Sequence, residues 1–144
     1  MSERHLGPAS AALREALGGL GDRWSLLVVE ALLAEPRRFS DLARDLGGIA
    51  PNVLSERLKR LEREGVVSAT PYSSRPLRLA YDLTPEGREL AGAIRLLADW
   101  GARRSGQAPS LRHRTCGTAL EARWYCPTCS RAVEEPETDD LRFV

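Results

Sequence analysis

Hydrophobic residues recur at helical spacing near the start of the chain and predict two helices. In the segment 10–18, Leu13 and Leu17 lie four residues apart, and Ser10 precedes them as a candidate N-cap. The two glycines that follow Leu17 are expected to end this helix. The sequence RWSLLVVEALLAE follows Asp22, a second candidate N-cap, and is apolar around most of its circumference. Such a helix is expected at the centre of the core.

Two shorter amphipathic helices follow, separated by a glycine-containing turn. The first, SDLARDLGG, is expected to begin with Ser40 as its N-cap and to stop at its glycine pair. The second, PNVLSERLKRLEREG, opens with Pro51 at the favoured first position and closes at Gly65. Its hydrophobic residues are spaced four and three apart and therefore lie on one face; they are Leu54, Leu58 and Leu61.

The pattern then changes to two strand-like segments and one long helix. VVSATPYS and LRLAYDL are joined by the turn sequence SSRP, which predicts a hairpin. A helix starts at Thr84-Pro85, and residues 105–110, SGQAPS, have the composition of a linker. The order of the elements predicts a mainly α fold with a small β-hairpin wing, a winged helix-turn-helix, over residues 8–104.

In a helix-turn-helix, the second helix enters the major groove of DNA, and a wing reaches neighbouring phosphates or the minor groove. With its leucines turned inward, the segment 51–64 presents polar side chains that suit base edges and phosphates. An ordinary amphipathic helix with a solvated charged face is the alternative for this segment alone, and the order of the elements favours DNA binding. The candidate DNA contacts are Asn52, Ser55, Lys59, Arg60 and Arg63 on the helix, with Arg75 and Arg78 on the wing.

Five segments together resemble the HxlR family of bacterial winged-helix regulators, which are relatives of MarR. They are GDRW at 21–24, RRFSDL at 37–42, GIAPNVLSERLKRLE at 48–62, YDLTPEGREL at 81–90 and DWG at 99–101. The resemblance covers residues 13–104. It implies a homodimeric transcriptional regulator, often a repressor, that binds a pseudo-palindromic operator in double-stranded DNA.

The resemblance also implies how two chains associate, through the first and last helices. A small-molecule effector between Trp24 and Trp100 is a further hypothesis, with plain core packing as the alternative. Many members sense oxidants through a cysteine just ahead of the first helix. Here residues 8–12 contain no thiol, which argues against sensing by a single cysteine. The expected dimer contacts are Leu13, Leu17, Leu90, Ile94 and Leu97.

All three cysteines lie in the segment HRTCGTALEARWYCPTCS, residues 113–130. The spacing is His113-x2-Cys116, nine residues, then Cys126-x2-Cys129. Two chelating turns separated by a loop are what tetrahedral zinc needs, and four protein ligands leave no open position for catalysis. The spacing predicts one structural Zn²⁺ per chain in a zinc ribbon at residues 111–133. Three free cysteines and an unrelated surface histidine are the alternative.

Charge and composition limit the remaining function classes. The chain has 144 residues and a net charge of +1. Residues 132–144 contain five acidic residues and one arginine, so the first 131 residues have 20 basic against 15 acidic residues and a net charge of +5. The acidic tail, 134–144, is expected to be solvated. No nucleophile–base set or phosphate-binding glycine loop indicates an enzyme.

The cellular compartment follows from the cysteines and the N-terminus. An odd cysteine count and a start without a basic-then-apolar run indicate a reduced, cytoplasmic compartment in a bacterium, with no membrane partner. The function predicted is that of a sequence-specific DNA-binding regulator. The alternative is a winged helix that serves protein–protein contacts, carries a structural zinc ribbon and does not read DNA sequence.

Overall fold

The computed structural model describes residues 8–106 and 110–133. Residues 14–94 form one compact unit, and residues 8–13 together with the described residues from 95 onward belong to a second. The predicted acidic tail, 134–144, lies outside the described residues, as does part of the predicted linker. No helix in the described part of the chain has the length and apolar character needed to cross a membrane.

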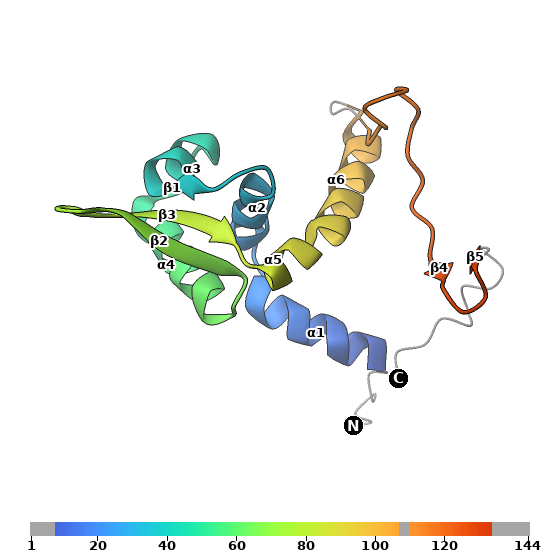
Figure 1. Cartoon of the computed structure of the whole chain (residues 1–144), viewed down its shortest axis with the longest axis horizontal. Coiled ribbons are helices and arrows are strands. Elements are labelled where there is room, and N and C mark those ends of the chain that lie inside the picture. Colours follow the sequence, from blue (N-terminus) through green and yellow to red (C-terminus); the bar gives the residue numbers. More distant parts are fainter. Residues whose placement is uncertain (1–7, 107–109, 134–144) are drawn as a thin grey trace. The chain divides into compact units, whose positions relative to one another are not determined.

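Four helices precede the hairpin along the chain (Figure 1): α1 (Pro8–Leu20), α2 (Arg23–Leu32), α3 (Phe39–Asp45) and α4 (Pro51–Arg63). Several predicted helix boundaries were wrong. Helix α1 begins at Pro8, so Ser10 lies inside the helix rather than at its N-cap, and α2 ends at Leu32 rather than at Glu35. Helix α1 continues through Gly18 and Gly19 to Leu20, because an isolated glycine pair weakens a helix without stopping it. Helix α3 begins two residues earlier than predicted, with Arg38 rather than Ser40 at the N-cap.

The N-cap predicted at Asp22 and the proline and glycine positions predicted for α4 are confirmed. The carboxylate of Asp22 accepts hydrogen bonds from the backbone amides of Trp24 and Ser25 at 3.0 and 3.1 Å, so it satisfies two otherwise unpaired donors of α2. Pro51 occupies the first turn of α4. Gly65, with a φ of 72°, follows the end of α4 in the left-handed region that favours glycine.

The predicted hairpin is confirmed and is joined by a third, very short strand. Strands β2 (Val67–Ser74) and β3 (Leu77–Leu83) pair antiparallel from Val67 opposite Leu83 to Ser74 opposite Leu77. Strand β1 (Arg37–Arg38) pairs with the other edge of β3, giving the order β1-β3-β2. Arg75 and Pro76, joined by a cis peptide bond, connect the two long strands.

The predicted last helix is divided into α5 (Pro85–Glu89) and α6 (Ala91–Ser105). Thr84 caps α5 as predicted, because its side chain accepts from the amide of Gly87 at 3.0 Å. The amide of Leu90 bonds to the carbonyl of Gly87, three residues back, at 3.2 Å, and the four-residue ladder resumes where Ile94 bonds to Leu90. This tighter turn separates the two helices.

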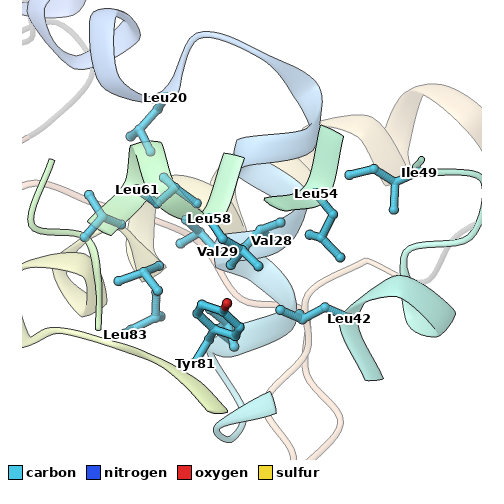
Figure 2. Close-up of a cluster of buried hydrophobic side chains, with 13 residues drawn as sticks. Leu20, Val28, Val29, Leu42, Ile49, Leu54, Leu58, Leu61, Tyr81 and Leu83 are labelled. Atoms are coloured by element: carbon cyan, nitrogen blue, oxygen red, sulfur yellow. The ribbon is translucent and has the colours of Figure 1, made fainter. Parts of the chain in front are cut away.

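The core lies between α2, α4 and the strands β2 and β3 (Figure 2). Leu54 and Leu61 of α4 are fully buried and Leu58 is nearly so, as the spacing predicted. Figure 2 shows these leucines with Val28 and Val29 of α2. Each such side chain contributes about 1.5–3 kcal/mol by leaving water. The core therefore fixes which face of α4 points inward.

Two small hairpin-like turns form the described C-terminal segment. In the first, Arg112 and Ala119 form an isolated antiparallel bridge. In the second, β4 (Tyr125–Cys126) pairs with β5 (Arg131–Ala132).

Candidate nucleic-acid interface

An ion pair that the sequence reasoning missed holds α4 against the start of α2. Arg57 Nε lies 3.1 Å from Oδ1 of Asp22, with an N–H that is poorly aligned for a hydrogen bond. Burial of Asp22 raises its pKa, but hydrogen bonds from the Ser25 hydroxyl and amide, together with the charge of Arg57, bring the pKa below its ordinary value. The sequence shows an arginine at position 57 but does not predict its partner, because Asp22 and Arg57 are distant in sequence.

The face of α4 opposite the core is polar and accessible. Asn52, Lys59 and Arg63 are exposed, and Ser55 is half-buried. These positions are three or four residues apart and therefore share one face of the helix. Amide, hydroxyl, ammonium and guanidinium groups on that face match the donors and acceptors of base edges and phosphates.

Arg60 differs from the other predicted contacts on α4. It is half-buried, and its Nη2 donates a hydrogen bond to the carbonyl oxygen of Gly18, near the C-terminus of α1. A cation at that end of a helix is favourable for the helix dipole. The structure therefore gives Arg60 an intramolecular partner, and its contact with DNA stays a prediction.

The hairpin extends beyond the helices on the side of α4 (Figure 1). Both predicted wing residues, Arg75 and Arg78, are exposed, and the turn is braced by a 3.0 Å hydrogen bond from Ser73 Oγ to the Pro76 carbonyl. Arg38 of β1 lies over the ring of Tyr72, with its Cζ 4.6 Å from the ring centre. That cation–π contact places a third arginine, which the sequence reasoning did not single out, against the wing.

The predicted dimer contacts divide into two groups. Leu13, Leu17 and Leu97 are 60%, 48% and 54% exposed, whereas Leu90 and Ile94 pack partly against the core. Leu96 and Trp100 of α6 are also exposed. Helices α1 and α6 thus each carry apolar side chains without a covering partner within the described chain, which is typical of an interaction surface.

The two tryptophans of the effector hypothesis have different surroundings. Trp24 packs against the core of residues 14–94, under the guanidinium of Arg23 at 4.3 Å. Trp100 is 53% exposed on α6, with Arg104 over its ring at 5.0 Å. The packing of Trp24 fits the plain-core alternative, and an effector stays a hypothesis.

The predicted metal ligands occur as two pairs. His113 Nδ1 lies 3.2 Å from Cys116 Sγ, and the side chains of Cys126 and Cys129 are hydrogen-bonded to each other. Hydrogen bonds from the Thr118 side chain and amide lower the pKa of Cys116 to about 7. Across the described residues, no three His, Cys, Asp or Glu side chains form a cluster suited to a metal. The four-ligand site stays a prediction.

Comparison with known proteins decides the family. The model for the HxlR-like helix-turn-helix matches residues 19–108, more than half of the chain. This protein belongs to the HxlR-like helix-turn-helix family. An uncharacterized HTH-type transcriptional regulator of Mycobacterium tuberculosis is 41% identical over 122 residues, covering 82% of this chain and 77% of the relative. The regulator YtfH of Escherichia coli is 34% identical over 100 residues, covering 69% of this chain and 79% of the relative.

Solved structures agree with this assignment. A candidate transcription factor from Pseudomonas aeruginosa superposes with a TM-score of 0.67 at 32% identity, covering 85% of this chain and 86% of that one. The winged helix-turn-helix fold is therefore confirmed, and the HxlR-family protein described here is a transcriptional regulator of the helix-turn-helix type rather than an enzyme.

Proposed function

We propose that this HxlR-family regulator binds a pseudo-palindromic operator as a homodimer and represses transcription from the adjoining promoter. The observation that carries the proposal is the division of α4 into two faces. Three leucines fix one face in the core, and Asn52, Lys59 and Arg63 are exposed on the other. A helix held in this way presents its polar face as a rigid unit, which base reading requires.

The residues of α4 take different roles in this proposal. Asn52 and Ser55 lie in the first turns, and the N-terminal part of a recognition helix contacts base edges. Asn52 reads adenine through a bidentate amide contact, and Ser55 donates to or accepts from a base. Lys59 reads guanine or holds a phosphate, and Arg63, at the far end, binds a phosphate.

The wing supplies contacts that do not depend on sequence. Arg75 and Arg78 are exposed at the end of the hairpin and near it. Neither side chain is buried, so both can reach phosphates or the minor groove without an additional desolvation cost. Counterion release from these contacts makes binding depend on salt, by roughly 0.9 log unit per tenfold change in salt for each phosphate neutralised.

Dimerisation follows from the apolar residues of the outer helices. Leu13 and Leu17 on α1, with Leu96 and Leu97 on α6, are all more than two-fifths exposed. A second copy of the chain would cover them and would place two α4 helices about one helical turn of DNA apart, roughly 10 bp. A symmetric dimer of this type reads an operator with matching symmetry. Occupation of that operator excludes RNA polymerase, which is the basis of the proposed repression.

Selection of genomic fragments by the purified full-length protein tests this function. Enriched fragments should share two inverted half-sites. When these fragments are used as templates for in vitro transcription, they should give less transcript with the protein than without it. Arg88→Ala is a suitable control variant, since Arg88 is paired with Asp82 at 2.7 Å and is not among the proposed contacts. A protein that enriches no common sequence would instead support the alternative of a winged helix used for protein contacts.

A further inference from the structure

The first C-terminal turn places a histidine and a cysteine beside each other. The amide of His113 donates to the Thr118 carbonyl at 2.8 Å, and the amide of Gly117 donates to the His113 carbonyl at 2.7 Å. Gly117, directly after Cys116, has a φ of 73°. The resulting 3.2 Å between His113 Nδ1 and Cys116 Sγ is close to the edge of a tetrahedral zinc site, about 3.6 Å from ordinary bond lengths.

The second turn repeats the construction of the first. Cys126 and Cys129 lie on the hairpin of β4 and β5, and the amide of Val133 closes it on the Trp124 carbonyl at 2.7 Å. Ser130, directly after Cys129, has a φ of 53°. A left-handed conformation is uncommon for a residue other than glycine, and it tends to persist where the surroundings require it. Both turns thus have a ligand, two spacer residues, a cysteine and a left-handed residue.

A further side chain contacts the sulfur of the first turn. Cys116 Sγ lies 3.3 Å from Oγ1 of Thr118, within hydrogen-bond distance. A partner of this kind orients a sulfur atom that ligates a metal. No disulfide is formed by any of the three cysteines. The first turn therefore holds its two ligand atoms together, and the second turn places its two cysteines at the same spacing on a hairpin.

Hydrophobic burial does not account for the defined conformation of residues 111–133. Trp124, Tyr125 and Leu120 are 66%, 63% and 47% exposed, and Leu111 is 36% exposed. A segment of this length cannot form a stable core alone, and a bound metal is a common substitute.

We propose that the turns of residues 113–116 and 126–129 close on a single Zn²⁺ within one chain, ligated by His113, Cys116, Cys126 and Cys129. Three thiolates and an imidazole form a donor set that suits zinc and disfavours magnesium or calcium, which prefer oxygen. Four protein ligands complete the tetrahedron, so the ion stabilises the segment and performs no chemistry. The proposal stands apart from DNA binding, because none of these residues belongs to α4 or the wing.

The zinc content of the full-length protein tests the proposal directly. Protein purified without chelator should contain about one zinc per chain by elemental analysis. Replacement of the ion by Co²⁺ should give the intense visible bands of a tetrahedral site and a thiolate charge-transfer band. Cys116→Ser and Cys126→Ser, one change in each turn, should each abolish stoichiometric zinc. Glu121→Gln and Ser130→Gly should keep it, since neither removes a ligand and glycine adopts the conformation of Ser130 readily.

Any of four results would overturn the proposal. These are a zinc content below about half an equivalent per chain, full zinc occupancy in either cysteine variant, an octahedral cobalt spectrum, and a Cys126–Cys129 disulfide in freshly purified protein. Half an equivalent, together with a metal-dependent link between chains, would mean that two copies share one ion. Circular dichroism of each variant should retain the helical signal of residues 8–105. The metal content can be measured without DNA, so failure to bind an operator leaves the zinc result intact.

Discussion

The carboxylate of Asp22 joins two helices of the DNA-binding unit, because it caps α2 and lies 3.1 Å from Nε of Arg57 in α4. The same carboxylate accepts a 2.8 Å hydrogen bond from the hydroxyl of Ser25, a fully buried residue. Asp22 therefore determines both where α2 begins and how α4 is held against it. The polar face of the proposed recognition helix depends on that arrangement.

Asp22→Asn should make the unit less stable at neutral pH, and the deficit should shrink in acid. Asn still caps a helix but carries no charge for Arg57, whereas Asp22→Ala also removes the cap, at a cost of about 1 kcal/mol. The folded-state pKa of Asp22 lies below its ordinary value of 3.8. Its ionised form therefore stabilises the fold above that value, and the contribution is lost as pH falls through the folded pKa. Urea unfolding of the wild type and of Asp22→Asn at pH 7 and pH 3 measures the difference in their free energies of unfolding. A deficit that is equal at both pH values would contradict the assignment.

Gly87→Ala should destabilise the same unit, because a methyl group at that position would collide with the backbone carbonyl of Val66. Overpacking of this kind costs about 1–3 kcal/mol. Gly92→Ala is the matched control, since nothing lies near a methyl group at that position within the described structure. The control should leave stability unchanged or raise it by up to about 1 kcal/mol through helix propensity. Thermal unfolding that ranks the two variants in the opposite order would show that α5 does not approach the Val66 carbonyl as described.

Asn52→Ala and Arg75→Ala should weaken operator binding in different ways. Loss of a base-reading amide should cost about 1–3 kcal/mol and relax the preference at one position of each half-site. Loss of a phosphate contact should weaken all sequences alike and reduce the salt slope by about 1. Fluorescence anisotropy with an operator and its single-position variants distinguishes them. Identical, uniform losses from both changes would mean that Asn52 does not read a base.

Leu97→Glu should separate the proposed dimer into monomers. Leu97 is 54% exposed on α6, and a buried carboxylate at a subunit interface is unfavourable. Leu77→Glu is the control, because Leu77 is 66% exposed on the wing and outside the expected interface. Sedimentation velocity at micromolar concentration should show a dimer for the wild type and the control, and a monomer for Leu97→Glu. A wild-type monomer would remove the basis for a two-fold operator.

The sequence allowed the order of the elements and the inner face of α4 to be predicted, since leucine spacing, proline at the first turn and glycine at the end are local signals. Most of the features that the sequence did not predict depend on tertiary contacts. The division between α5 and α6 lies at the tighter turn where the amide of Leu90 bonds to Gly87. The role of Arg57 depends on Asp22, before α2, and that of Arg60 depends on Gly18 in α1. Arg38 was missed because its partner Tyr72 lies on another strand. Whether the four predicted metal ligands meet depends on an ion, which sequence spacing predicts only indirectly.

Footprinting of the purified protein on an enriched genomic fragment tests the central claim most directly. A dimer that inserts two copies of α4 should protect two inverted half-sites whose centres are about 10 bp apart, with affinity that falls steeply as salt rises. The Asn52→Ala protein should retain the salt dependence and lose the contrast between the operator and a scrambled sequence. A single half-site, or equal protection of operator and scrambled DNA by the wild-type protein, would contradict the account.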